Sequence, residues 1–146
     1  MKQHKTFNNR RRGQRGFTLM ELLVVLAILG LLMALVGPNV LRQLGGAKTK
    51  TAGIQIKDLE QAAEMYKLDV GRYPSSQEGL EALVNKPSNA TGWNGPYLKS
   101  DVPLDPWNRE YNYKYPGDRA ELDIFSYGQN GTPGGEGEDQ DVGNWN

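Results

Sequence analysis

The sequence predicts an α+β protein in which one long N-terminal helix, transmembrane in its first part, packs on a small antiparallel β-sheet. Three observations support this fold class. Residues 17–36 form an apolar run whose only charged side chain is Glu21. Apolar residues then recur at helical spacing through 52–70, and two short segments at 111–115 and 122–127 alternate in the manner of a β-hairpin.

The apolar run is long enough to span a bilayer. A helix rises about 1.5 Å per residue, so roughly 20 residues cross the hydrocarbon core of about 30 Å. Residues 1–16, which precede the run, hold six basic side chains and no acid. This flank predicts that the leader stays in the cytoplasm and that the chain after the span crosses the membrane. A secretory signal peptide is disfavoured, because the run is too long and no small-x-small cleavage site closes it before 37–38.

Glu21 is the unusual residue of this run. A charged side chain costs about 2.5–3.5 kcal/mol at the centre of a transmembrane helix and less near its ends. An acid in such a place is a candidate functional residue, and it needs a cation that the run itself does not supply.

The segment Gly16-Phe17-Thr18-Leu19-Met20-Glu21 and the aliphatic run after it resemble the N-terminal signal of type IV pilins and type II secretion pseudopilins. The resemblance implies that prepilin peptidase cuts after Gly16 and that the new amino terminus, Phe17, is N-methylated. It also implies that Glu21 pairs with the α-amino group of Phe17 in a neighbouring subunit. Two opposite charges desolvated together offset each other, whereas either alone remains costly. Glu21 is therefore expected to act in the assembly of a helical homopolymer.

The long helix is predicted to continue through 37–70 and to end before Gly71. One apolar seam at spacings of three and four residues marks its buried face: Ala52, Ile56, Leu59, Ala63, Tyr66 and Val70. Pro38 lacks a backbone N–H, Gly37 directly precedes it, and Gly45-Gly46 adds a second weak point. We therefore expect a kinked or locally melted stretch over about 36–46.

The remaining chain, 71–146, is predicted to form one globular domain. Ser75 or Ser76 can cap a short helix over about 77–85. The range 88–110 is rich in turns, and its aromatic residues are expected in the core: Trp93, Tyr97 and Trp107.

The predicted hairpin turns at Pro116-Gly117-Asp118. An extended piece near 98–104 would add a third strand to the sheet. The final segment, 128–146, is acidic and rich in glycine, which alone favours a solvated tail. Its position directly after a strand, and the Trp145 near its end, favour docking instead.

Three longer blocks, 64–87, 95–107 and 122–145, resemble the major pseudopilins of type II secretion, so the resemblance covers almost all of the chain after the leader. It implies a structural subunit that polymerises into a periplasmic pseudopilus and helps push folded exoproteins through an outer-membrane channel. The implied location is the bacterial inner membrane, with the C-terminal domain in the periplasm. The implied partners are further copies of the chain, minor pseudopilins, prepilin peptidase, and an inner-membrane assembly platform with its ATPase.

The same resemblance implies a structural Ca²⁺ in the C-terminal loop. The side-chain ligands would be Asn130 and Asp141, with backbone carbonyls near Tyr127 and Thr132. Loops rich in oxygen donors suit Ca²⁺, which takes about 6–8 oxygens. Asn130 departs from the family, where an aspartate is usual, so the affinity for Ca²⁺ should be lower.

The composition argues against other functions. The only histidine, His4, lies in the leader and the chain has no cysteine, which removes histidine- and cysteine-based catalysis. Without residues 1–16 the chain has 11 basic and 17 acidic side chains, a net charge of −6. A nucleic-acid surface is therefore not expected, and neither is an enzyme.

Two alternatives remain at the level of sequence. A type IV pilus or competence pilin would share the N-terminal signal, although many such pilins have a C-terminal disulfide that a chain without cysteine lacks. A singly anchored periplasmic enzyme or binding protein would share the apolar run but would retain residues 1–16.

Overall fold

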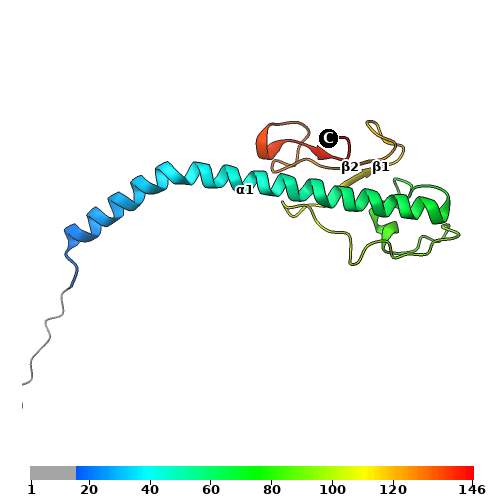
Figure 1. Ribbon diagram of the computed structural model, residues 1–146, viewed down its shortest axis with the longest axis horizontal. Coiled ribbons are helices and arrows are strands. Elements are labelled where there is room, and N and C mark those ends of the chain that lie inside the picture. Colours follow the sequence, from blue (N-terminus) through cyan, green and yellow to red (C-terminus); the bar gives the residue numbers. More distant parts are fainter. Residues whose placement is uncertain (1–15) are drawn as a thin grey trace, which may run out of the picture. The chain divides into compact units, whose positions relative to one another are not determined.

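The structure is a computed structural model that describes residues 16–146. The chain divides into two compact units, Met1–Asn39 and Val40–Asn146, and each is described by itself. Its helices and strands follow in this order: α1 (Leu19–Val70), the 3-10 helix η1 (Leu80–Leu83), β1 (Asn112–Lys114), β2 (Asp123–Ser126), the 3-10 helix η2 (Gly137–Asp139) and β3 (Val142–Gly143) (Figure 1).

The described part of the first unit, residues 16–39, consists of the beginning of α1 and the three residues before it. Among residues 16–146, α1 is the one helix long and apolar enough to cross a membrane. Large apolar side chains from Phe17 to Val36 are all exposed in the isolated chain. An apolar helix without a protein core around it is consistent with membrane anchoring.

The helix continues without interruption through the stretch where local melting was expected. Residues 36–46, including Pro38, all belong to α1. Of the kinked or locally melted stretch that was expected, local melting is therefore wrong for the single chain, and the kink stays a prediction. Proline removes one hydrogen bond of the helical ladder, and the neighbouring turns retain theirs.

The second half of α1 carries the core of the domain. Five residues of the predicted seam are at most 1% exposed: Ala52, Ile56, Leu59, Ala63 and Tyr66. Val70, at the end of the helix, packs against the same cluster. The seam and the end of the helix at Val70 are confirmed.

The sheet has three antiparallel strands in the order β1-β2-β3. Tyr113 pairs with Ile124, which confirms the hairpin, and Ser126 pairs with Val142 of β3. The third strand thus comes from the C-terminal segment, and the prediction of a strand near 98–104 is wrong. That range contains Pro103, which has no N–H to donate to a ladder.

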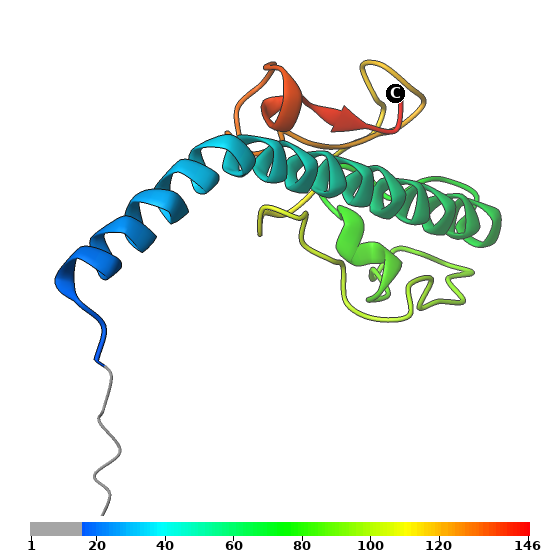
Figure 2. The ribbon, with the colours of Figure 1, turned by 60° about the vertical axis from the view of Figure 1, so that its left-hand side comes forward.

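Figure 2 shows how the domain is laid out around the second half of α1. The sheet and the C-terminal segment cover the helix on one side, and the segment after Gly71 runs back along another. Trp93, Tyr97 and Trp107 pack against the core from that returning segment, which confirms their expected role.

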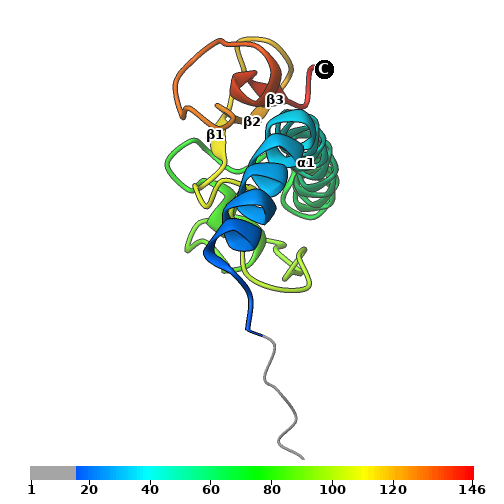
Figure 3. The same ribbon diagram turned by 90° about the vertical axis from the view of Figure 1, so that its left-hand side faces the viewer.

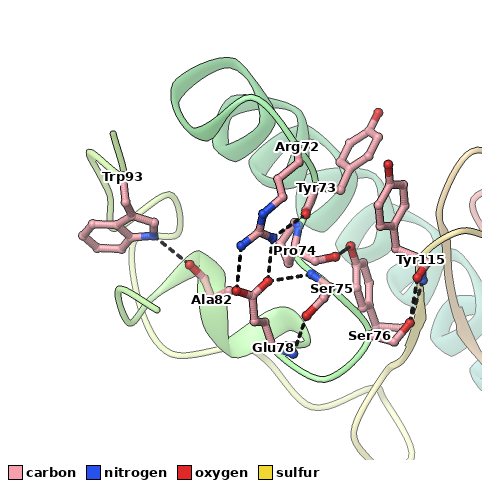
Figure 4. A network of polar contacts seen from close by, with 10 residues as sticks. Arg72, Tyr73, Pro74, Ser75, Ser76, Glu78, Ala82, Trp93 and Tyr115 are labelled. Atoms are coloured by element: carbon pink, nitrogen blue, oxygen red, sulfur yellow. Dashed lines mark hydrogen bonds and ion pairs between the residues drawn. The ribbon is translucent and has the colours of Figure 1, made fainter. Parts of the chain in front are cut away.

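The short helix expected over 77–85 is only the 3-10 helix η1, preceded by a turn. Gly79 has φ 62°, a left-handed conformation that interrupts an α-helix. Ser75 still caps this turn: its N–H donates to Glu78 Oε2 (2.6 Å), and the Glu78 N–H donates to Ser75 Oγ (3.2 Å). Arg72 holds the same carboxylate with two hydrogen bonds of 2.7 and 2.9 Å (Figure 4).

Candidate functional site

Thr18 and Glu21 build a helix cap at the beginning of α1. The Thr18 N–H donates to Glu21 Oε2 (2.8 Å), and the Glu21 N–H donates to Thr18 Oγ1 (3.2 Å). This reciprocal pair is a capping box, which satisfies two amides that the first turn of a helix leaves without partners. The carboxylate also lies at the helix N-terminus, where the macrodipole favours negative charge.

Glu21 therefore has a partner within its own chain before any neighbour arrives. Its second oxygen, Oε1, makes no hydrogen bond to the described residues and can accept another donor. Phe17 is 81% exposed, and nothing lies within 4 Å of a Cβ built on Gly16. The expected cleavage boundary between Gly16 and Phe17 is thus open on the surface of the described chain.

The role of Thr18 is one that apolar patterning does not reveal. Its signal in the sequence is the Thr-x-x-Glu spacing of a capping box directly before an apolar run. The same four residues that resemble a processing signal also begin the helix. The cap holds the Glu21 carboxylate beside the chain end that cleavage would create.

The second candidate site is the C-terminal segment 128–146, which docks on the domain. Val142 is 6% exposed, and the ring centroids of Phe125 and Trp145 lie 5.4 Å apart. Asn144 accepts from the Ile124 N–H (3.0 Å) and donates to Glu60 of α1 (2.9 Å). Docking through Trp145 is confirmed, and the solvated tail that composition favours is not what the structure shows.

A buried carboxylate, Asp105, and an exposed guanidinium, Arg109, hold the beginning of this segment. The Arg109 guanidinium donates to the carbonyls of Gly128 (2.6 Å) and Gln129 (2.7 Å). Asp105 is 4% exposed and accepts from the N–H groups of Trp107 (3.0 Å) and Arg109 (2.9 Å) and from the hydroxyl of Ser126 (2.5 Å). The sequence does not single out these contacts, because they join segments about 20 residues apart.

The side chain of Glu138 accounts for the glycine at position 45 of the long helix. This side chain lies directly against Gly45, where an added Cβ would overlap it. Gly45 is buried, although it looked like a weak point of the helix in the sequence. The glycine therefore has a packing role, since it lets the C-terminal segment approach α1.

The predicted calcium ligands fall on two turns of the C-terminal segment. The Asn130 side chain accepts from the Thr132 N–H (3.0 Å), which brings these two residues together. The Asp141 carboxylate accepts from the Gly134 N–H at 3.0 and 3.1 Å. Tyr127 packs its ring on Phe125, with centroids 5.1 Å apart.

The candidate ligand atoms of Asn130, Asp141, Tyr127 and Thr132 are all oxygens, which are the ligands that Ca²⁺ prefers. Within residues 16–146 no group of three or more histidine, cysteine or acidic side chains is placed to hold a metal ion. A site here would therefore depend on carbonyl and amide oxygens as well as on Asp141. The calcium ligands stay a prediction.

Comparison with known proteins identifies relatives over most of the chain. The family model described as type II secretion system, protein G, matches residues 39–145, and a prokaryotic N-terminal methylation motif matches residues 11–37. Type II secretion system core protein G of Vibrio cholerae is 47% identical over 92% of this chain and 94% of its own length. The protein of the same name from Pseudomonas aeruginosa is 46% identical over 92% of this chain and 97% of its own length.

A solved structure agrees with these relatives. The major pseudopilin of the type 2 secretion system of enterohaemorrhagic Escherichia coli is 34% identical, with a TM-score of 0.62. The likeness covers 70% of this chain and 87% of that chain. These relatives do not favour the alternative of a type IV pilus or competence pilin. The chain therefore belongs to the type II secretion system protein G family and is a structural pseudopilin subunit, not an enzyme.

Proposed function

We propose that this chain is the major subunit of a type II secretion pseudopilus. Its precursor sits in the bacterial inner membrane with residues 1–16 in the cytoplasm and the C-terminal domain in the periplasm. Prepilin peptidase removes residues 1–16, and Phe17 is N-methylated. An assembly platform and its ATPase then add the subunit, together with minor pseudopilins, to a helical fibre that helps push folded exoproteins through an outer-membrane channel.

The position of Glu21 is the observation that supports this proposal most. The carboxylate is fixed by the Thr18 N–H through Oε2, and Oε1 has no hydrogen bond within the described chain. It is the only charge of an apolar run that begins at the predicted new terminus. A neighbour's α-amino group would complete its hydrogen bonding and neutralise it, and desolvation strengthens such a pair only when both charges are present. This charge pair would therefore favour the addition of a subunit whose Phe17 amino group lies at the depth of Glu21 in the membrane.

The experiment that tests this proposal compares the wild-type chain with Glu21→Ala in its host. We expect the purified wild-type protein to begin with a methylated Phe17 by mass spectrometry and to form fibres that sediment. Glu21→Ala should keep a folded domain, because residue 21 lies outside the unit Val40–Asn146, but should form no fibres. Glu21→Gln is the matched control, since it can accept the Thr18 N–H but carries no charge.

Wild-type protein that keeps residues 1–16, or Glu21→Ala that forms fibres normally, would contradict the proposal. Loss of fibres in Glu21→Ala but not in Glu21→Gln would show that the cap matters and the charge does not.

We also propose that Ca²⁺ organises the C-terminal loop, held by Asn130 and Asp141 with carbonyls at Tyr127 and Thr132. When bound, the ion would supply a positive charge that attracts the oxygen ligands of these turns and holds the turns together. The all-oxygen donors and the glycine-rich turns support the proposal. The neutral Asn130 reduces the charge of the site, so the affinity should be lower than with an aspartate there.

A further inference from the structure

The domain leaves one face of α1 bare. Figure 3 shows the sheet and the loops of the unit Val40–Asn146 around adjoining sides of the second half of α1, and no other segment on its right-hand side. On the bare face Ile54 is 63% exposed, Met65 55% and Leu68 83%. With the exposed Gln61 they follow spacings of seven, four and three residues, which place all four on one helical face. We call these four residues the outer stripe.

The membrane does not explain the outer stripe. The hydrocarbon core is about 30 Å thick and is filled by the run 17–36, so Leu68 lies outside it. Leu68 is nevertheless more exposed than any large apolar residue of that run, where Phe17 reaches 81%. Met65 and Leu68 are neighbours on this face, and exposed large apolar side chains that lie together mark a place where another molecule binds.

The two edges of the outer stripe carry opposite charges. Successive helical residues lie about 100° apart, so Lys57 and Asp58 flank the stripe on its two sides. Lys50, two turns before Lys57, extends the basic edge toward the N-terminus. Glu64, two turns after Lys57, ends it, with its carboxylate accepting from the Tyr73 hydroxyl. The side chains of Lys50, Lys57 and Asp58 form no hydrogen bond or ion pair within the described part of the chain. Their charges are thus available to a partner.

Each edge is also the wall of an open groove. The groove on the basic edge has a volume of about 350 Å³ and runs between Lys50, Lys57 and the end of the chain from Val142. The groove on the acidic edge, of about 400 Å³, lies between Asp58 and the loop that carries Lys99 and Asp101. The stripe is therefore a ridge between a basic groove and a mainly acidic one. Helices pack when ridges of one surface enter grooves of another.

We propose that a second copy of this chain covers the outer stripe in the fibre, with the Lys57 edge of one subunit facing the Asp58 edge of the next. The inference rests on the proposed function, because it assumes that the chain polymerises. Contact of the Lys57 edge of one subunit with the Asp58 edge of the next, side by side, is heterologous, because different patches of identical subunits meet. Heterologous contacts that do not close into a ring generate helical filaments.

The test uses the full-length chain and its fibres. Leu68→Ser and Lys57→Glu should each lower the yield of sedimented fibres at least about tenfold, while the thermal unfolding midpoint of the domain changes little, because both side chains are exposed. The double variant Lys57→Glu with Asp58→Lys exchanges the two edges and should recover most of the yield. Lys86→Glu is the control, since Lys86 is exposed but lies away from the stripe.

Disulfide trapping gives an independent readout, because the natural chain contains no cysteine. Lys57→Cys alone and Asp58→Cys alone should give no crosslink in oxidised fibres, and a chain with both should give a ladder of oligomers. A crosslinked dimer without a ladder would overturn the proposal in favour of a two-fold contact.

The outcomes separate this inference from the proposed function. If the wild-type chain forms no fibres, both fall. If wild type and Glu21→Ala behave as expected but Leu68→Ser and Lys57→Glu assemble normally, the fibre stands and the outer stripe is not its interface. Crosslinks from residue 57 or 58 to a different protein, with no ladder, would also overturn the inference.

Discussion

Asp105 offers the sharpest test of how the C-terminal segment is held. Its carboxylate is 4% exposed and accepts three hydrogen bonds, from the Trp107 and Arg109 amides and from the Ser126 hydroxyl. Asp105→Ala removes all three acceptor contacts. A buried donor left without a partner costs about 1–3 kcal/mol, and water can reach the two partly buried amides but not Ser126, which is 1% exposed.

We therefore expect Asp105→Ala to lower the free energy of unfolding by about 3 kcal/mol. In a domain of this size about 1 kcal/mol corresponds to a shift of roughly 4–8 °C, so the melting temperature should fall by more than about 10 °C. The assay is thermal unfolding of the full-length chain in detergent, followed by tryptophan fluorescence, since all three tryptophans lie after residue 71. The emission of Trp145 should change first, because its segment depends on Arg109 and Ser126.

Two further variants serve as controls for this prediction. Asp105→Asn keeps an acceptor for the two amides and should lose only about 1 kcal/mol. Asp118→Ala removes an exposed aspartate that pairs with Lys114, and should change stability by less than about 0.5 kcal/mol. Equal melting temperatures for wild type and Asp105→Ala would refute the argument that these contacts hold the segment.

Two other predictions concern pH and calcium. Hydrogen bonds from Arg72 lower the pKa of Glu78 from 4.5 to about 2, so the stability that depends on the charged pair is complete above about pH 4.5 and is lost as the pH falls through about 2. The melting temperature of wild type should thus fall more steeply than that of Glu78→Gln across this window, and parallel curves would contradict the linkage. Calcium at about 100 times its Kd should stabilise the domain by about 2.7 kcal/mol relative to chelator. Asn130→Asp should reach this effect at a lower calcium concentration, and identical melting of both chains in calcium and chelator would remove the proposed site.

The sequence alone was sufficient for features that depend on local periodicity. The apolar run, the seam from Ala52 to Tyr66, the end of the helix at Val70 and the hairpin around Tyr113 and Ile124 are all found where the pattern places them. Each depends on residues that are neighbours along the chain or on one face of one element. The family could be inferred for the same reason, because its signal is a continuous segment around Glu21.

Tertiary contacts decided what the local pattern could not. The third strand is β3 and not 98–104. The partner of β2 depends on which segment the folded chain brings to its free edge, and local sequence does not show this. Gly79 shortens a plausible helix through a single positive φ. Arg109 donates to the carbonyls of Gly128 and Gln129, which are 19 and 20 residues further along the chain and come near it only in the folded domain.

The same division applies to the functional surfaces of the chain. The sequence by itself determined that Glu21 stands alone in an apolar run after a glycine boundary, since charge and order along the chain are sufficient to show it. The seam predicted which face of α1 is buried, and only the folded domain decided that no other segment covers the opposite face. That choice depends on where the sheet and loops pack, and it leaves Leu68 in water between edges of opposite charge.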